Sequence, residues 1–139
     1  MKYPEELIRG ISSLDYIDQE GRVSAQAFQF DDMSRDDGLL EASINWYDDE
    51  GALEKLLNQK KQGQDDVYQF KAGAAILSRA WLDDTIARPN AQGTLSYERA
   101  SIEDNPYHGN LLRKQGLSKA IYTMLSASIA MCVERKIMR

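Results

Sequence analysis

The sequence has little of the chemistry that holds small scaffolds together. Its 139 residues include one cysteine, Cys132, and one histidine, His108. A single cysteine cannot form an internal disulfide, which argues against a secreted domain stabilised by disulfides. A zinc site needs several nitrogen or sulfur ligands, and one histidine with no cysteine near it in sequence does not supply them. We therefore expect neither a metal site nor a cofactor.

Long hydrophobic segments are also absent. The longest nearly apolar run covers residues 120–133. It is interrupted by Thr123 and two serines, and it is shorter than the roughly 20 residues that span a bilayer. The first residues, Met-Lys-Tyr-Pro-Glu-Glu, lack the apolar segment of a signal peptide. These features predict a soluble, cytoplasmic protein that does not enter a membrane.

The familiar motifs of nucleotide-binding and hydrolytic enzymes are missing. The chain contains no Gly-x-x-x-x-Gly-Lys-Ser/Thr, no Gly-x-Gly-x-x-Gly and no Gly-x-Ser-x-Gly. Its composition, 42% hydrophobic and 28% charged, is that of an ordinary globular protein. A chain of this length fits one domain, and no Gly/Ser or Pro linker divides it. We therefore expect a single domain over residues 1–139.

Charge is distributed unevenly along the chain. The net charge is −5, but the residues after Leu112 carry +5 and the residues up to Leu112 carry −10. The acidic total argues against broad nucleic-acid binding, which needs many Lys and Arg side chains on one face. The basic C-terminal segment nevertheless leaves two alternatives open: it packs near its own acidic body, or it meets an acidic partner or a phosphate backbone.

Alternation of apolar and polar residues predicts three strands. In residues 39–46 every second side chain from Leu40 to Trp46 is apolar and the intervening ones are polar, which favours an antiparallel strand with one face in water. Residues 67–77 form the second clear strand pattern, and residues 94–102 look like a third strand. Residues 23–30 fit either a weak strand or a short helix.

Helical patterns occur at the start, the middle and the end of the chain. Residues 3–10 and 12–18 indicate short helical turns, and residues 78–86 are ambiguous. A helix should follow Asp49 and end near Gly63, and a long one should cover residues 118–138. We therefore predict an α+β fold: a small mixed or antiparallel sheet of three to five strands, packed against a long C-terminal helix and a shorter central helix.

His108 is the first candidate for chemistry. It lies in the loop 104–110, where Pro106 and Gly109 favour a tight turn, and a histidine readily exchanges a proton near neutral pH. Tyr107 and Asn110 flank it, as a second candidate catalytic group and a ligand-binding group. The alternative is a loop histidine that only hydrogen-bonds a carbonyl or caps a helix.

Two arginines near the start of the chain are candidate anion ligands. Arg9 precedes Gly10 and Arg22 follows Gly21, and an arginine beside a glycine can hold a phosphate or carboxylate with its planar fork. An ADP-ribosyl type of transferase would want such an arginine, a serine such as Ser24 and a late acidic residue, but no acid is evident for the last role. Ordinary surface arginines are the alternative.

The C-terminal helix has the broadest apolar surface of the predicted elements. We expect a partner interface at Ile121, Leu125, Ile129, Ile137 and Met138, because a helix that is apolar on more than one side is either central to the core or shared with another chain. The sequence thus favours a non-catalytic interaction subunit of a bacterial complex, or a homodimer. The alternative is a small enzyme or an anion- or nucleotide-binding domain around His108 and Arg9.

Overall fold

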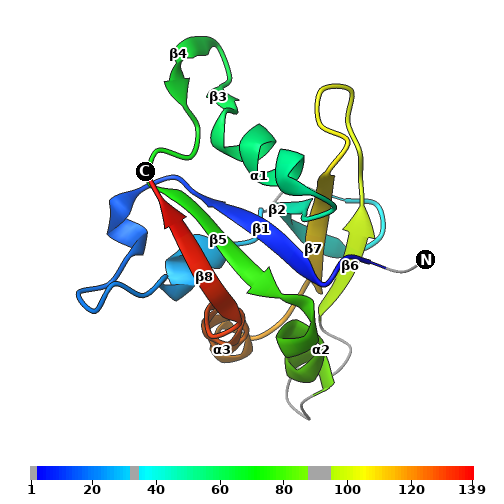
Figure 1. Cartoon of the computed structure of the whole chain (residues 1–139). Helices are drawn as coiled ribbons and strands as arrows, with labels where there is room; N and C mark the ends of the chain where they lie inside the picture. The colour runs from blue at the N-terminus through cyan, green and yellow to red at the C-terminus, as the bar shows by residue number, and fades with distance from the viewer. Residues whose placement is uncertain (1–2, 32–34, 88–94) are drawn as a thin grey trace.

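The computed structural model describes residues 3–31, 35–87 and 95–139. Its centre is a six-stranded sheet in the order β6-β7-β2-β1-β5-β8, and every neighbouring pair is antiparallel (Figure 1). The strands are β1 (Glu6–Ile11), β2 (Leu39–Trp46), β5 (Gly73–Ser78), β6 (Leu95–Arg99), β7 (His108–Lys114) and β8 (Val133–Met138). A separate hairpin of β3 (Lys60–Lys61) and β4 (Gln64–Tyr68) projects from the body at the top of Figure 1.

The described residues form three α-helices and two short 3-10 helices. These elements are η1 (Leu14–Tyr16), η2 (Ala25–Phe28), α1 (Glu50–Leu57), α2 (Arg79–Ala87) and α3 (Lys119–Ala130). α1 begins where the Asp49 side chain accepts a hydrogen bond from the Gly51 N–H at 2.8 Å, and the acidic residues there suit the positive end of the helix dipole.

The helices cover both faces of the sheet. On one face Phe28 of η2, Leu82 of α2 and Ile129 of α3 pack with Leu7 and Trp46 of the sheet in the larger hydrophobic cluster. On the other face α1 packs against Ile8, Ala74 and Ile76 in the smaller one. β1 and β5 are therefore buried on both sides.

The C-terminal segment corrects the predicted fold class. Instead of a long helix over residues 118–138, α3 ends at Ala130 and the chain returns as β8 along β5. The main sheet consequently has six strands, not three to five. The physical reason is β5, whose residues are all buried. A strand inside the core needs hydrogen-bonding partners on both edges, and β8 supplies the second edge. The shorter central helix is present as α1.

The N-terminal helical turn was also predicted wrongly. Residues 6–11 form β1, which pairs with β5 over its whole length. Pro4 and Gly10 fit the start and stop of a helix, but Ile8 and Ile11 are β-branched and lie on opposite faces of the strand. Gly10 allows the ring of Phe70 to pack directly on the backbone of β1, because a Cβ at this position would collide with that ring.

The remaining predictions are mixed. The strand over residues 39–46 is confirmed as β2, and the helix after Asp49 is confirmed but ends at Leu57. The segment 67–77 is not one strand: it divides between β4 and β5. The predicted strand 94–102 corresponds to β6, with residue 94 outside the described part, and β7 had no counterpart in the prediction.

Candidate functional site

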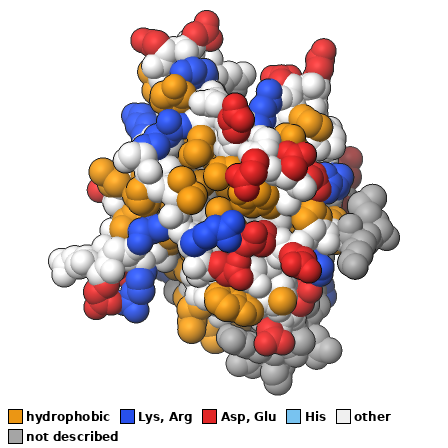
Figure 2. Space-filling model, in the orientation of Figure 1, with side chains coloured by type: hydrophobic (Ala, Val, Ile, Leu, Met, Phe, Trp, Pro, Cys, Tyr) orange, Lys and Arg blue, Asp and Glu red, His pale blue; other side chains and the backbone are white. Residues whose placement is uncertain are grey.

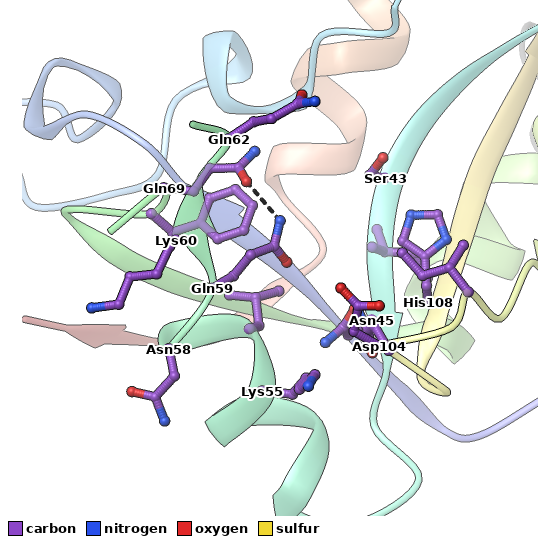
Figure 3. A pocket seen from close by; sticks show the side chains of 15 residues that line it. Ser43, Asn45, Lys55, Asn58, Gln59, Lys60, Gln62, Gln69, Asp104 and His108 are labelled. Atoms are coloured by element: carbon purple, nitrogen blue, oxygen red, sulfur yellow. Dashed lines mark hydrogen bonds between the residues drawn. The ribbon is translucent and has the colours of Figure 1, made fainter. Parts of the chain in front are cut away.

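A cavity of about 600 Å³ lies beside the C-terminal half of β2 and next to the β3–β4 hairpin. Its walls come from β2, the C-terminal end of α1, the hairpin and the loop before β7 (Figure 3). The volume is within the range of roughly 300–1,000 Å³ that is typical of small-molecule sites. The lining side chains that carry polar groups are Ser43, Asn45, Lys55, Asn58, Gln59, Lys60, Gln62, Gln69, Asp104, Asn105 and His108.

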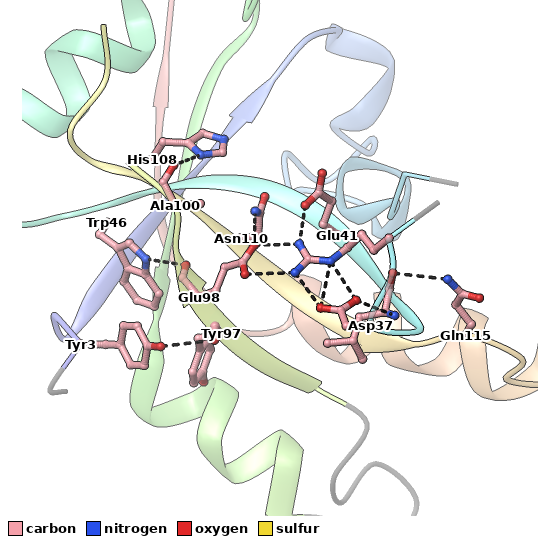
Figure 4. Close-up of polar contacts among 12 residues, drawn as sticks. Tyr3, Asp37, Glu41, Trp46, Tyr97, Glu98, Ala100, His108, Asn110 and Gln115 are labelled. Atoms are coloured by element: carbon pink, nitrogen blue, oxygen red, sulfur yellow. Dashed lines mark hydrogen bonds and ion pairs between the residues drawn. The ribbon is translucent and has the colours of Figure 1, made fainter. Parts of the chain in front are cut away.

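His108 lies in the wall of this cavity. It is the first residue of β7 and is paired with Asn45 of β2, so the polar face of two neighbouring strands forms that wall. Its Nδ1 is 2.9 Å from the carbonyl oxygen of Ala100 (Figure 4). A carbonyl oxygen only accepts, so Nδ1 carries the hydrogen, and the neutral ring then has its lone pair on Nε2. The ring is thus held as a hydrogen-bond acceptor.

Two buried asparagines hold the loop that precedes His108. Asn45 donates from Nδ2 to the carbonyl of Ala52 in α1 at 3.0 Å, and Asn105 donates from Nδ2 to Asn45 Oδ1 at 2.8 Å. Asn105 Oδ1 in turn accepts the backbone N–H of Tyr107 at 3.1 Å. Asn45 and Asn105 are 3% and 5% exposed, so the chain connects β2, α1 and the loop without help from bulk water. This network fixes the cavity wall around His108.

The opposite wall is made by the hairpin. Gln59 donates from Nε2 to Oε1 of Gln69 at 2.6 Å, and the backbone N–H of Gln69 donates to the Gln59 carbonyl at 3.0 Å. In Figure 3 both glutamines lie across the cavity from Ser43 and His108. The ammonium of Lys60 lies 3.5 Å from the ring centre of Tyr68, which does not line the cavity. The charge of Lys60 therefore contacts an aromatic ring and not the cavity.

Tyr107 and Asn110 adjoin His108 in sequence, but neither lines the cavity. Tyr107 donates its hydroxyl to Asp49 at 2.9 Å, beside the start of α1, and this bond raises the pKa of the phenol. Asn110 donates from Nδ2 to Glu98 at 2.7 Å, whereas its buried Oδ1 has no hydrogen-bond partner among the described residues. Tyr107 thus connects the segment before β7 to the start of α1, whereas Asn110 connects β7 to β6.

Asn110 is part of an ion-pair cluster on that side of the sheet. Arg35 lies 2.7 Å from both Glu41 and Glu98 and 2.8 Å from Asp37 (Figure 4). The guanidinium holds the pKa of Glu98 and of Asp37 below their ordinary values. Because Arg35 is matched by three carboxylates, the cluster has no surplus positive charge to offer an anion.

Arg9 donates hydrogen bonds to backbone carbonyls and does not line the cavity that contains His108. β1 and β2 pair only at Leu7–Trp46 and Ile8–Asn45 and then part, and the guanidinium lies in the opening. It donates to the carbonyls of Ala27, Gln29 and Ser43 at 3.0, 3.3 and 2.7 Å. Burial lowers the pKa of Arg9, and the negative charge of Asp31 acts against that change. Its donors thus satisfy one carbonyl of β2 and two carbonyls in and just after η2.

Arg22 belongs to a different surface. It forms ion pairs with Asp18 and Glu20 and is largely exposed. It lines a second groove of about 580 Å³ between the 18–25 segment, the end of α3 and β8. The structure therefore does not bring Arg9, Arg22 and His108 into one site. Ser24 Oγ, the serine considered with them, is buried and has no hydrogen-bond partner among the described residues.

The residues predicted as a partner interface are divided between the core and the surface. Leu125 and Ile129 are 3% and 0% exposed and pack in the larger cluster of the same chain. Ile121 is half-buried on α3, and Ile137 is half-buried on β8, packed against the smaller cluster. Met138, on β8, is 39% exposed. The exposed residues of α3 are instead Lys119, Ala120, Thr123, Met124 and Ala127, and the exposed Met131 follows the helix directly.

The basic C-terminal segment does not form a basic helix. Arg135, Lys136 and Arg139 follow α3, on or beside β8. Arg135 is paired with Glu6 at 2.7 Å, and Arg139 donates to the carbonyl of Phe70 at 3.1 Å. On the face drawn in Figure 2, which includes β8, basic side chains alternate with acidic ones. This face has no continuous basic surface of the kind that a phosphate backbone prefers.

Several residues of the cavity had no place in the sequence prediction. Ser43 and Asn45 were recognised only as the wet side of a strand, and nothing local indicates that α1 and the hairpin enclose that side. Gln59 and Gln69 are separated by the whole hairpin. The one available signal was the loop containing Asn105 and His108, which does contribute to the cavity.

Within residues 3–31, 35–87 and 95–139, no group of three or more His, Cys, Asp and Glu side chains is placed to hold a metal ion. No helix in that part of the chain has the length and apolar character needed to cross a membrane. Comparisons of the chain with protein-family models, with curated proteins and with solved structures give no match.

Proposed function

We propose that the protein binds a small polar ligand in the cavity beside His108. The observation that carries the proposal is the position of the imidazole: Nδ1 is committed to the Ala100 carbonyl, and the ring lies in the wall of a cavity of about 600 Å³. A fixed acceptor in a concave site lined by further polar groups is the usual arrangement for orienting a ligand. The buried Asn45–Asn105 pair supports it by holding that wall in place.

The first test blocks the cavity without disturbing the core. Ser43 is exposed and its side chain lines the cavity, so Ser43→Trp fills the space on a strand that tolerates aromatic residues. Ser96→Trp is the matched control, because Ser96 is an exposed serine of β6 that does not line the cavity. Small polar metabolites should shift the amide resonances of Asn45 and His108 in the wild type and in Ser96→Trp, but not in Ser43→Trp. Equal shifts in all three proteins would refute a site in this cavity.

A second function, self-association through α3, is supported by a separate observation. Apart from Lys119, its first residue, α3 exposes no charged side chain, and Met124 on the helix and Met131 just after it are 45% and 75% exposed. A helix face with a single charge at its start and flexible apolar side chains along it is typical of contact surfaces. We therefore place the proposed interface at these two methionines and not at Leu125 and Ile129, which are buried in the core.

Light scattering tests the second function. A homodimer should have twice the 15.8 kDa mass of the chain, and Met124→Glu with Met131→Glu should return it to the monomer. Leu14→Glu is the control, because Leu14 is 68% exposed on a different element. A wild-type protein that stays monomeric at high concentration would refute self-association.

A further inference from the structure

The cavity beside His108 has few charges on its walls. Lys55, Lys60 and Asp104 are the ionic residues among the described side chains that line it, and none of these side chains is an arginine. Lys60 is occupied by its contact with Tyr68, which leaves one ammonium and one carboxylate on the rim. Ligands with several phosphate groups are usually held by arginine forks or by backbone N–H groups at a helix start. Neither feature occurs among the described residues that line this cavity.

The orientation of α1 also disfavours an anion. The lining residues that α1 and its end contribute are Lys55, Leu56, Asn58 and Gln59, so the helix turns its C-terminal end toward the cavity. That end is the negative pole of the helix dipole, with carbonyl groups directed outward. It attracts hydrogen-bond donors and repels negative charge.

Most of the uncharged polar side chains that line the cavity are amides. Six of the lining residues are asparagine or glutamine, and they lie on both walls (Figure 3). The bond from Gln59 to Gln69 uses one amide hydrogen of Gln59 and the Gln69 carbonyl. The Gln69 amide group and the Gln59 carbonyl have no side-chain partner among the described residues. Gln69 thus offers a donor and Gln59 an acceptor, which are the two roles that each hydroxyl of a polyol takes.

Apolar side chains also line the cavity, between its polar groups. Phe70 is half-buried, with its ring against Gly10, and Ile102 is 55% exposed on the opposite loop. Apolar contacts of this size suit the C–H groups of a sugar ring, while hydroxyl groups around the ring reach the amides on the two walls.

We propose, building on the ligand-binding function above, that the cavity takes a neutral, hydroxyl-rich ligand of the size of a mono- or disaccharide. His108 Nε2 accepts a hydrogen bond from one hydroxyl group, and the Gln69 amide donates to another. Asp104 and the C-terminal end of α1 accept from hydroxyl groups at the rim. The binding is reversible and involves no covalent step.

The experiment is a titration of the ¹⁵N-labelled protein followed by amide chemical shifts. The probes are glucose, galactose, N-acetylglucosamine, maltose and myo-inositol, with glucose 6-phosphate and adenosine monophosphate as charged counterparts. At least one neutral probe should shift the amides of Asn45, Gln59 and His108 in a saturable manner. Its phosphorylated counterpart should bind more weakly at equal concentration.

Two substitutions locate the contacts. Gln69→Leu removes one wall's donor and should weaken binding of the neutral probe by about tenfold, as should His108→Phe, which keeps the ring but loses the acceptor. Gln64→Leu is the matched control: Gln64 is an exposed glutamine of the same hairpin that does not line the cavity, and its affinity should equal that of the wild type.

The outcomes separate the ligand class from the function itself. If only the charged probes shift the cavity residues, the neutral polyol is refuted and the binding function stands. If no probe of either kind shifts them, the polyol is refuted and the blocking test with Ser43→Trp decides the function. Equal losses in Gln64→Leu and Gln69→Leu would also overturn the assignment, because the effect would then not come from the cavity wall.

Discussion

Replacing Asn45 with alanine is expected to destabilise the protein by about 2–3 kcal/mol. The side chain makes two buried hydrogen bonds, to the Ala52 carbonyl and from the Asn105 amide, at 3.0 and 2.8 Å. Its removal costs the net value of these bonds and leaves the Asn105 N–H, in a residue only 5% exposed, without its partner. An unsatisfied buried group of this kind costs about 1–3 kcal/mol by itself.

Urea unfolding followed by circular dichroism measures this loss. With a slope of about 2 kcal/mol per molar, the midpoint should fall by about 1–1.5 M while the slope stays unchanged. The melting temperature should fall by about 6–12 °C for a domain of this size. A changed slope would indicate that the variant alters the unfolded state or the two-state transition instead.

A double-mutant cycle with Asn105→Ala tests the reasoning. Removing both side-chain amides eliminates the Asn105 N–H that Asn45→Ala leaves without a partner. The double variant should therefore lose about 1–2 kcal/mol less unfolding free energy than the sum of the single variants. Losses that add to within about 0.5 kcal/mol would refute the idea that the two asparagines act as one buried unit. The same variants should broaden the resonances of residues 100–108, because the pair holds this loop.

Three further perturbations address the sheet and its charges. Gly73→Ala should cost about 2–4 kcal/mol in chemical unfolding, because φ is +132° and a Cβ would collide with the carbonyl of Ile137; a loss below about 1 kcal/mol would contradict this packing. Deleting Ile137, Met138 and Arg139 removes partners of Ala74 and Gly73 and should cost about 2 kcal/mol, and an unchanged melting temperature would contradict a C-terminal strand. Arg35 lowers the pKa of Glu98 and Asp37, so these carboxylates stabilise the fold above their ordinary pKa and lose that effect as the pH falls through the lowered values. Arg35→Gln should therefore make the unfolding free energy less dependent on pH below 4.5, the ordinary glutamate value, and an identical pH profile would refute the role of the cluster.

The candidate site was visible in the sequence only as a loop. His108 and Asn105 lie where the local pattern of Pro and Gly places a turn, and the structure puts both in the cavity wall. Arg9 shows the limit of such reasoning. An arginine before a glycine resembles an anion clamp, but its donors are taken by carbonyls of η2 and β2. Which carbonyls a sheet leaves unpaired depends on how two strands diverge, and no local pattern encodes that.

The sequence by itself determined the elements whose environment is decided locally. β2 has one face in the core and was readable from alternation, and α1 was readable from Asp49 and the leucine spacing that follows. Only the tertiary structure decided β1, β7 and β8. β1 and β7 are buried on both faces, which removes the alternation that marks a strand. The segment after Ala130 continues the helical pattern of α3, yet it pairs with β5, some 60 residues earlier, because the fully buried β5 needs hydrogen bonds along its second edge.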